Sequence, residues 1–353
     1  MPKNILLILT GGTICSVADE RTNEQTSDVA SAKRLIVENF RRGGSKYKSE
    51  DAVVFDIKTP LDILSENMTV VHLNTLISAL KGYDLSTYDG VIMLHGTDTL
   101  AYTASMLSVL LAGTTVPLIL VSSQLPLYEE KSNGNANFRA AVELIAKGIA
   151  PNVYAVYRNT ERLEDGSELC RMYVHLGSHL LQCAERSDNF YSKDMTEINA
   201  DCPDYKGVAT ERENMLLYSI GELSSCVLYI KPYVGMDYGF YSLDGVRAVL
   251  HGVYHSGTAC VNPYNDSDNA SHSVLSLRSR CEERGIAFFV EPCEDKAYKY
   301  ETTGILLRSG AYHVFDMTSE MTYAKLLLGC ALGYEGDRLA DFVKSEINGE
   351  KIY

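Results

Sequence analysis

The chain has 353 residues, of which 46% are hydrophobic and 22% charged, a composition that fits two folded domains and excludes a disordered protein. Its formal net charge of -14 argues against a nucleic-acid partner, because binding phosphate backbones depends on clustered lysine and arginine. The apolar stretch 106–120 comes nearest to a membrane span, but Pro117 interrupts it, so we expect no membrane partner.

The nine cysteines are scattered, with no CxxC pair and no Cys/His cluster of metal-ligand spacing. We therefore expect reduced thiols in a cytoplasmic protein, and no metal site built from these cysteines. The apolar run 5–9 is too short for a signal sequence, and no cleavage site of small residues follows it, which favours the same location.

Short apolar runs alternate with segments of helical periodicity in the first half of the chain, which is the pattern of an α/β protein. Strands are predicted at 5–9, 53–57, 90–94, 118–121 and 153–157, and helices at 31–40, 70–80, 99–111 and 137–147. Right-handed crossovers between parallel strands would bring the carboxyl ends of all these strands to one edge of a sheet, where we expect the functional site.

A polar, charged stretch follows and separates this region from a second, smaller α/β set. We predict a first domain at 1–188, a connection at 189–222 and a second domain at 223–353. The second domain is predicted to have strands at 226–230, 248–253 and 287–290 and helices at 271–284 and 318–332. The expected fold class is α/β, with a mainly parallel sheet flanked by helices in the larger N-terminal domain.

The first strand ends in Thr10-Gly11-Gly12-Thr13. Paired glycines permit a tight turn and let the backbone approach a ligand closely, so the turn presents Thr13 at the carboxyl end of the strand. Taken alone, the loop is equally consistent with a simple polar turn. A threonine hydroxyl is also a poor nucleophile unless another group activates it.

A second polar loop, His95-Gly96-Thr97-Asp98, joins the strand at 90–94 to an apolar helix. Thr97 or Asp98 would cap that helix, since free amide groups and the helix dipole favour a carboxylate there. A third loop, with Ser65 and Glu66, follows the strand at 53–57 and can reach the same edge. Hydroxyls and carboxylates that converge there suit a small substrate with both an amine and a carboxylate.

Two of these loops, TGGTI at 10–14 and HGTDTLAYTAS at 95–105, resemble the signature loops of the asparaginase/glutaminase family. Three further matches extend the resemblance over nearly the whole chain: SSQLPL with SNGNANF within 122–138, YHSGT at 254–258 and DMTSEMTYAKL at 316–326. The last is similar to the cytoplasmic type I branch. The resemblance implies a two-domain asparaginase-like fold and an L-asparagine amidohydrolase.

The resemblance also implies roles for residues of the first loops. Thr13 corresponds to the nucleophile that forms an acyl-enzyme with the side-chain carbonyl of asparagine and releases ammonia, after which water releases aspartate. Thr97 is similar to the threonine that helps to activate the attacking group or the water. Asp98 is similar to the aspartate that binds the substrate amine. Because the nucleophile supplies the covalent step, neither a metal nor an organic cofactor is implied.

The remaining site residues follow from the same resemblance. Ser65 and Glu66 match the loop that holds the α-carboxylate and amine of an amino-acid substrate. Backbone amides near Gly12 and Gly96 would stabilise the oxyanion. The family's active sites are commonly completed by a neighbouring subunit, which implies a homodimer or a homotetramer.

The family lysine that accompanies the second threonine and the aspartate is not found in its expected place. Counting from Gly166 brings Arg171 to that position, whereas counting back from Ser187 brings His175 or Leu176 there. Arginine stays charged and cannot be a general base, while histidine has a suitable reference pKa of about 6.5. A histidine that simply forms a hydrogen bond on an alternating strand is the other explanation.

Two further features bear on activity and regulation. The activating tyrosine that the family has shortly after the nucleophile is missing, since the first tyrosine is Tyr47. Cys293 is similar to a cysteine in the allosteric site of the type I branch, and a buried structural cysteine is the alternative. The competing functions are an inert amino-acid-binding homologue, an amidase for another amide, and the ammonia-producing part of a transamidation system.

Overall fold

The computed structural model describes residues 1–18, 22, 24–184, 186–199, 204–210, 215–261, 270–293 and 300–352. The chain forms two compact units. The first comprises Met1–Ser219 and Ile347–Gly349, and the second comprises Ile220–Glu346 and the chain from Glu350 onward.

The described part of the first unit contains a seven-stranded sheet in the order β4-β1-β5-β6-β7-β8-β9. The first five strands in this order are parallel, and β8 and β9 are antiparallel to their neighbours. Their bounds are β1 Lys3–Leu9, β4 Val53–Lys58, β5 Gly90–Leu94, β6 Leu118–Val121, β7 Val153–Arg162, β8 Glu168–Leu176 and β9 Thr196–Ile198. The expected α/β class with a mainly parallel sheet is confirmed.

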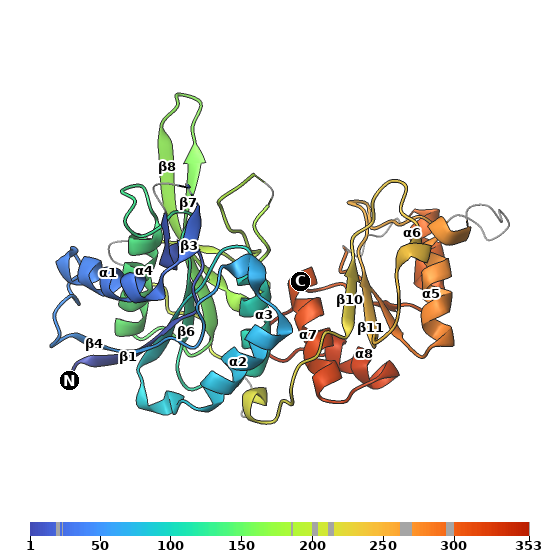
Figure 1. The fold of residues 1–353 in the computed structure, drawn as a ribbon, viewed down its shortest axis with the longest axis horizontal. Coiled ribbons are helices and arrows are strands. Elements are labelled where there is room, and N and C mark those ends of the chain that lie inside the picture. The colour runs from blue at the N-terminus through green and yellow to red at the C-terminus, as the bar shows by residue number, and fades with distance from the viewer. Residues whose placement is uncertain are drawn as a thin grey trace. The chain divides into compact units, whose positions relative to one another are not determined.

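Helices cover both faces of this sheet (Figure 1). On one face, α1 (Val29–Arg42) packs against α4 (Gly134–Ala146), while α2 (Val70–Lys81) and α3 (Leu100–Leu110) lie on the other. The connections β1–α1–β4 and β6–α4–β7 run in opposite directions along the sheet although their helices share a face. The two crossovers therefore have opposite hands, and the expectation of right-handed crossovers throughout is wrong.

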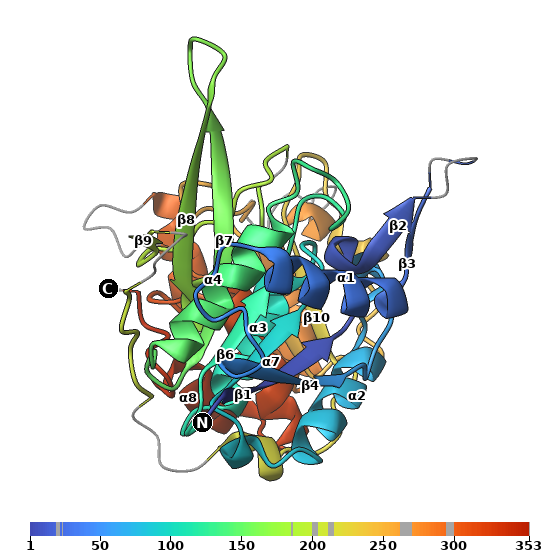
Figure 2. The same cartoon turned by 90° about the vertical axis from the view of Figure 1, so that its left-hand side faces the viewer.

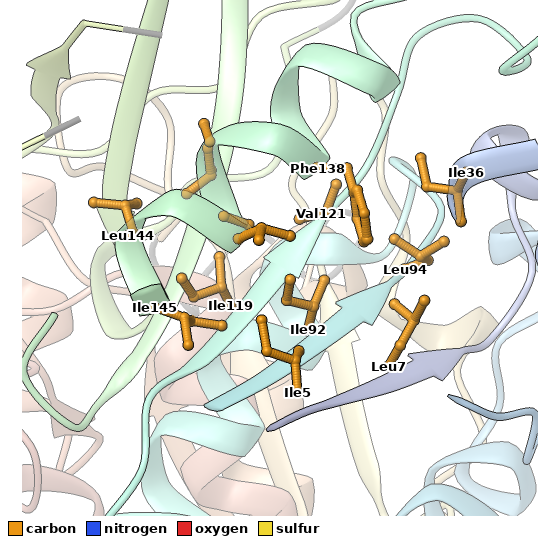
Figure 3. Close-up of a cluster of buried hydrophobic side chains, with 14 of the residues drawn as sticks. Ile5, Leu7, Ile36, Ile92, Leu94, Ile119, Val121, Phe138, Leu144 and Ile145 are labelled. Carbon is orange, nitrogen blue, oxygen red and sulfur yellow. The ribbon is translucent and has the colours of Figure 1, made fainter. Parts of the chain in front are cut away.

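One hydrophobic core of the first unit lies between the sheet and the pair α1 and α4. Figure 3 shows Ile5, Ile92 and Ile119 of three adjacent strands in one cluster with Phe138 and Ile145 of α4. Central strands of this kind are buried on both faces, which is why their sequences read as continuous apolar runs rather than alternating ones. Asp28 caps the N-terminus of α1, because its carboxylate accepts a hydrogen bond from the Ser31 N–H at 3.0 Å.

The first unit extends further along the chain than the predicted first domain. β9 lies inside the expected connection 189–222 and pairs with β8, and the paired ends of β7 and β8 project beyond the rest of the unit (Figure 2). Near the C-terminus the chain returns to the first unit, where the side-chain amide of Asn348 donates to the Ser108 carbonyl and to Asn152 Oδ1, each at 2.9 Å. Residues 200–203 and 211–214 of the expected connection lie outside the described residues.

The second unit has a parallel sheet in the order β10-β11-β12-β13. Its described elements are β10 Val227–Ile230, β11 Ala248–His251, β12 Ala287–Val290, β13 Tyr312–His313, α5 Val274–Glu283, α6 Glu301–Arg308, α7 Ser319–Ala331 and α8 Gly336–Lys344. The sequence did not predict β13, α6 or α8, nor the hairpin of β2 (Ser16–Ala18) and β3 (Gln25–Ser27) in the first unit. These elements are short, and periodicity is weakest over short segments.

None of the helices among the described residues is both long enough and apolar enough to cross a membrane.

Candidate active site

Three loops meet at the carboxyl ends of β1, β4 and β5. Thr10, directly after β1, is tied to β5, because its N–H and its hydroxyl both donate to the Leu94 carbonyl, at 3.1 and 2.9 Å. Gly12 is tied to the loop after β4, where its N–H donates to the Ile63 carbonyl at 2.7 Å. The strand ends that the sequence predicted to share an edge do share it.

A close approach between the three loops joins Gly12, Gly96 and Ser65. A Cβ atom added to Gly12 would lie 2.2 Å from the Gly96 Cα, and one added to Gly96 would lie 2.4 Å from both Cβ and Oγ of Ser65. Neither glycine has room for a side chain, because the backbones of Gly12 and Gly96 are in contact and the Ser65 side chain lies against Gly96. We call this contact the loop junction.

Thr13 follows the loop junction and is half-buried at the start of a 3-10 turn, Thr13–Cys15. Its carbonyl accepts a hydrogen bond from the Ser16 hydroxyl at 2.9 Å, and the Cys15 N–H donates to the Gly12 carbonyl at 2.9 Å. These bonds hold the backbone on both sides of Thr13. The short hairpin of β2 and β3 begins immediately after the turn.

Asp98 is bonded to Ser65 and does not cap α3. The Asp98 N–H donates to Ser65 Oγ at 3.2 Å, and Ser65 Oγ lies 3.4 Å from Asp98 Oδ2. The cap of α3 is Thr99, whose hydroxyl donates to the Ser65 carbonyl at 3.1 Å. The expectation that Thr97 or Asp98 caps this helix is therefore wrong, and the exposed carboxylate of Asp98 is accessible to a ligand.

Thr97 is half-buried, and its carbonyl accepts a hydrogen bond from the Leu100 N–H at 3.3 Å as α3 begins. Glu66 is exposed in the 3-10 turn Ser65–Asn67. The structure thus brings Gly12, Ser65, Gly96 and Asp98 into contact, with Thr13, Thr97 and Glu66 next to them in the chain. Those roles that the resemblance assigns to these side chains stay predictions.

Gln182 and Cys183 also lie near Asp98, although no sequence motif indicated them. The side-chain amide of Gln182 donates a hydrogen bond to the Asp98 carbonyl. The pKa of the neighbouring Cys183 is raised, first by burial and then by the negative charges of Asp188 and Asp98. These two residues follow β8 by several positions, and only the antiparallel return of the chain carries them to the site.

The structure does not bring Arg171 or His175 to the loop junction. Arg171 lies exposed on β8 and pairs with Glu197 at 3.4 Å. His175 is buried on the same strand, with its Nδ1 2.9 Å from Ser192 Oγ, and burial lowers its pKa to about 3. Among the described residues, none of the contacts of these two side chains involves Thr13, Thr97 or Asp98.

Cys293 lies in the second unit, at the wall of a pocket of about 390 Å³. Glu291 and Ser319 also line this pocket, together with the segment 253–257. The side chain is half-buried, so the structure places it beside a cavity rather than within the core. Its role in an effector site stays a prediction. Within the described ranges, no group of three His, Cys, Asp or Glu side chains has the geometry to hold a metal ion.

Comparison with known proteins places this arrangement in a family. The family model described as "Asparaginase, N-terminal" matches residues 4–199. A glutamyl-tRNA(Gln) amidotransferase subunit from Methanococcus maripaludis strain C6 is 26% identical over 365 aligned positions, which cover 99% of this chain and 80% of that protein. The L-asparaginase of Thermococcus kodakarensis is 29% identical over 193 positions, covering 54% of this chain and 53% of that protein.

Solved structures agree on the fold. The thermostable L-asparaginase from Thermococcus kodakarensis superposes with a TM-score of 0.72 at 21% identity, and covers 99% of both chains. L-asparaginase I from Vibrio cholerae O1 biovar eltor superposes with a TM-score of 0.71, also at 21% identity and with 99% of both chains covered. Since the family model covers more than half of the sequence, the chain belongs to the asparaginase family and has its amidohydrolase fold.

Proposed function

We propose that this chain hydrolyses the side-chain amide of L-asparagine to aspartate and ammonia through an acyl-enzyme on Thr13. The observation that carries the proposal is the loop junction of Gly12, Gly96 and Ser65. Because the two glycines touch, the threonines that follow them, Thr13 and Thr97, lie on adjacent loops. The proposal assigns Thr13 as the nucleophile and Thr97 as the hydroxyl that assists the reaction, and both threonines directly follow glycines of the loop junction.

In the proposed reaction, the Thr13 hydroxyl oxygen bonds to the amide carbonyl carbon. The C–N bond then breaks, and the nitrogen leaves as ammonia with the hydroxyl proton. Backbone N–H groups near Gly12 and Gly96 stabilise the negative oxygen of the tetrahedral intermediate. Water, assisted by Thr97, finally attacks the ester carbonyl and releases aspartate.

In the proposal, Asp98 and the turn that contains Ser65 and Glu66 bind the substrate. The exposed carboxylate of Asp98, beside Ser65 Oγ, binds the α-amine of the substrate. The turn with Ser65 and Glu66 holds the α-carboxylate and amine. Choice between asparagine and glutamine depends on pocket shape, because one methylene is worth about 1–3 kcal/mol in a pocket.

The test is a turnover panel of asparagine, glutamine and small amides with the wild type and Thr13→Ala. We expect ammonia release from asparagine by the wild type and its loss in Thr13→Ala, with an unchanged melting temperature as evidence of folding. Equal rates for the two proteins would rule out Thr13 as the nucleophile. Turnover of another amide alone would keep the mechanism and change the substrate.

A second candidate is the ammonia-producing part of a transamidation system. The relatives that are subunits of glutamyl-tRNA(Gln) amidotransferases support it, since two of them from Methanococcus maripaludis align with 99% of this chain. The net charge of -14 argues against a surface for tRNA on this chain alone. Efficient glutamine turnover together with weak asparagine turnover would favour this candidate.

A third candidate is an amino-acid-binding homologue without catalysis. The observation in its favour is that Arg171 and His175 make their contacts with Glu197 and Ser192, away from the loop junction. Calorimetric binding of aspartate or asparagine without ammonia release would support it. For each candidate we propose a homodimer or homotetramer, which sedimentation would distinguish.

A further inference from the structure

His95 is the buried residue that links the end of β5 to α3. Its side chain has no exposed surface. The ring nitrogen Nδ1 lies 2.8 Å from the carbonyl oxygen of Gly96, the next residue in the chain. The other nitrogen, Nε2, lies 2.9 Å from the hydroxyl oxygen of Thr103, one turn into α3. The imidazole therefore bridges a peptide of the loop junction and a helix of the core.

The partners of the ring determine its protonation. A carbonyl oxygen can only accept, so Nδ1 carries the hydrogen and donates it to Gly96. Nε2 then accepts from the Thr103 hydroxyl, which has a hydrogen to give. Burial lowers the pKa of His95 to about 4, so the ring is neutral at pH 7. Both nitrogens are satisfied in one tautomer, which gives the ring a single orientation.

This orientation also sets that of the peptide between Gly96 and Thr97. Peptide units are planar, and no cis peptide bond occurs in the described chain, so the Thr97 N–H points opposite to the Gly96 carbonyl. Because the Gly96 carbonyl is bonded to the His95 imidazole, the Thr97 N–H points away from that ring. On its other sides the Gly96 backbone meets Gly12 and Ser65. The peptide has little freedom to rotate.

We infer that His95 and Thr103 act as a pair of positioning residues, which hold the Gly96–Thr97 peptide in the orientation that amide cleavage at Thr13 needs. The inference rests on the proposed function. Neither side chain touches the substrate, since His95 is enclosed between the loop and α3. Their effect on the reaction passes through the peptide, where small displacements of a positioned group are costly in rate.

The sharpest variant is Thr103→Val, which removes the hydroxyl and keeps the branched shape. Thr103→Ser keeps the hydroxyl and is the conservative rescue. Thr114→Val is the matched control, because Thr114 is also buried and its hydroxyl donates to the Val116 carbonyl at 2.9 Å, in the turn between α3 and β6. Both valine variants bury an unsatisfied partner and should lower the melting temperature by similar amounts.

We expect kcat for the amide to fall about tenfold or more in Thr103→Val, with a smaller change in KM. Thr103→Ser should recover the rate to within about threefold, and Thr114→Val should keep the wild-type kcat. A Thr103→Val enzyme with the kcat of Thr114→Val would overturn the inference while leaving the proposed function intact. A wild type that cleaves no amide in the panel would instead overturn the proposed function, and with it the reaction that the pair serves.

A second measurement does not depend on turnover. In ¹⁵N spectra of histidine-labelled protein, His95 should show a protonated Nδ1 and an unprotonated Nε2 at pH 7, assigned by the loss of its signals in His95→Gln. Thr103→Val should shift the Nε2 signal, because that nitrogen loses its donor, and Thr114→Val should not. Protonation at Nε2 in the wild type would contradict the arrangement on which the inference depends.

Discussion

The Cα atom of Gly96 lies where a side chain on Gly12 would have to be, since a Cβ added to Gly12 comes within 2.2 Å of it. This contact joins the loop after β1 to the loop after β5. The obstacle to a side chain on Gly12 is the Gly96 backbone, which cannot rotate away as a flexible side chain can. The two glycines thus determine how closely Thr13 and Thr97 approach each other.

Gly12→Ala should abolish amide turnover and destabilise the first unit. Gly12 has φ of 78°, a conformation that costs a residue with a side chain about 1–3 kcal/mol, and the clash with Gly96 adds to that cost. The measurements are kcat and the melting temperature. Gly44→Ala is the control, because a Cβ there meets no atom within 4 Å. A Gly12→Ala protein with wild-type kcat would show that the junction is not needed.

Asp98→Asn should raise KM for asparagine by about tenfold or more and affect kcat less, because the side chain keeps its shape but loses the charge that pairs with the substrate amine. The Ser65 hydroxyl, 3.4 Å from Oδ2, can still donate to the amide oxygen of asparagine at this position. The control is a substrate that lacks the α-amine, such as succinamate. If KM for succinamate rises equally, Asp98 does not bind the amine.

Lys325→Met should destabilise the second unit by about 3–5 kcal/mol, because it leaves a buried carboxylate without its partner. Lys325 Nζ lies 2.8 Å from Glu350 Oε1, and neither side chain is exposed. The double variant Lys325→Met/Glu350→Leu should recover much of the loss, since it removes both charges. Thermal melts of the three proteins measure this. A single variant as stable as the double variant would show that the pair is not coupled.

Acidification from about pH 6.5 should destabilise the protein before its carboxylates titrate. Burial lowers the pKa of His95 and His251 to about 4 and that of His175 to about 3, from 6.5 in the unfolded chain. Between these values the unfolded state binds protons that the folded state excludes. The free energy of unfolding therefore falls as pH falls, by up to about 1.4 kcal/mol per pH unit for each histidine.

Denaturant titrations at pH 7, 6 and 5 test this dependence. His175→Asn is the informative variant, because an amide there can still bond to Ser192 Oγ but does not titrate. Its slope against pH should be smaller by about 1.4 kcal/mol per unit. If the slope of the unfolding free energy against pH is unchanged, His175 binds a proton in the folded state as readily as in the unfolded state.

The central strands and the two signature loops could be predicted from the sequence because their signals are local. Runs such as 5–9 and 90–94 are buried on both faces of the sheet, so each reads as a strand without knowledge of its neighbours. Glycine pairs and polar residues directly after such runs identify the strand ends that form an edge. The candidate nucleophile Thr13 and its neighbour loops followed from this pattern and from the family resemblance.

Contacts between segments that are distant in sequence were determined only by the tertiary structure. Only the fold shows that Asp98 bonds to Ser65 rather than capping α3, and that Gln182 reaches the Asp98 carbonyl. The register of β7 and β8 likewise places Arg171 among exposed residues and His175 in the core. A sequence pattern shows which residues can be buried and which can form a turn. The partner of a polar side chain depends instead on chain crossings and strand register, which many distant residues determine together.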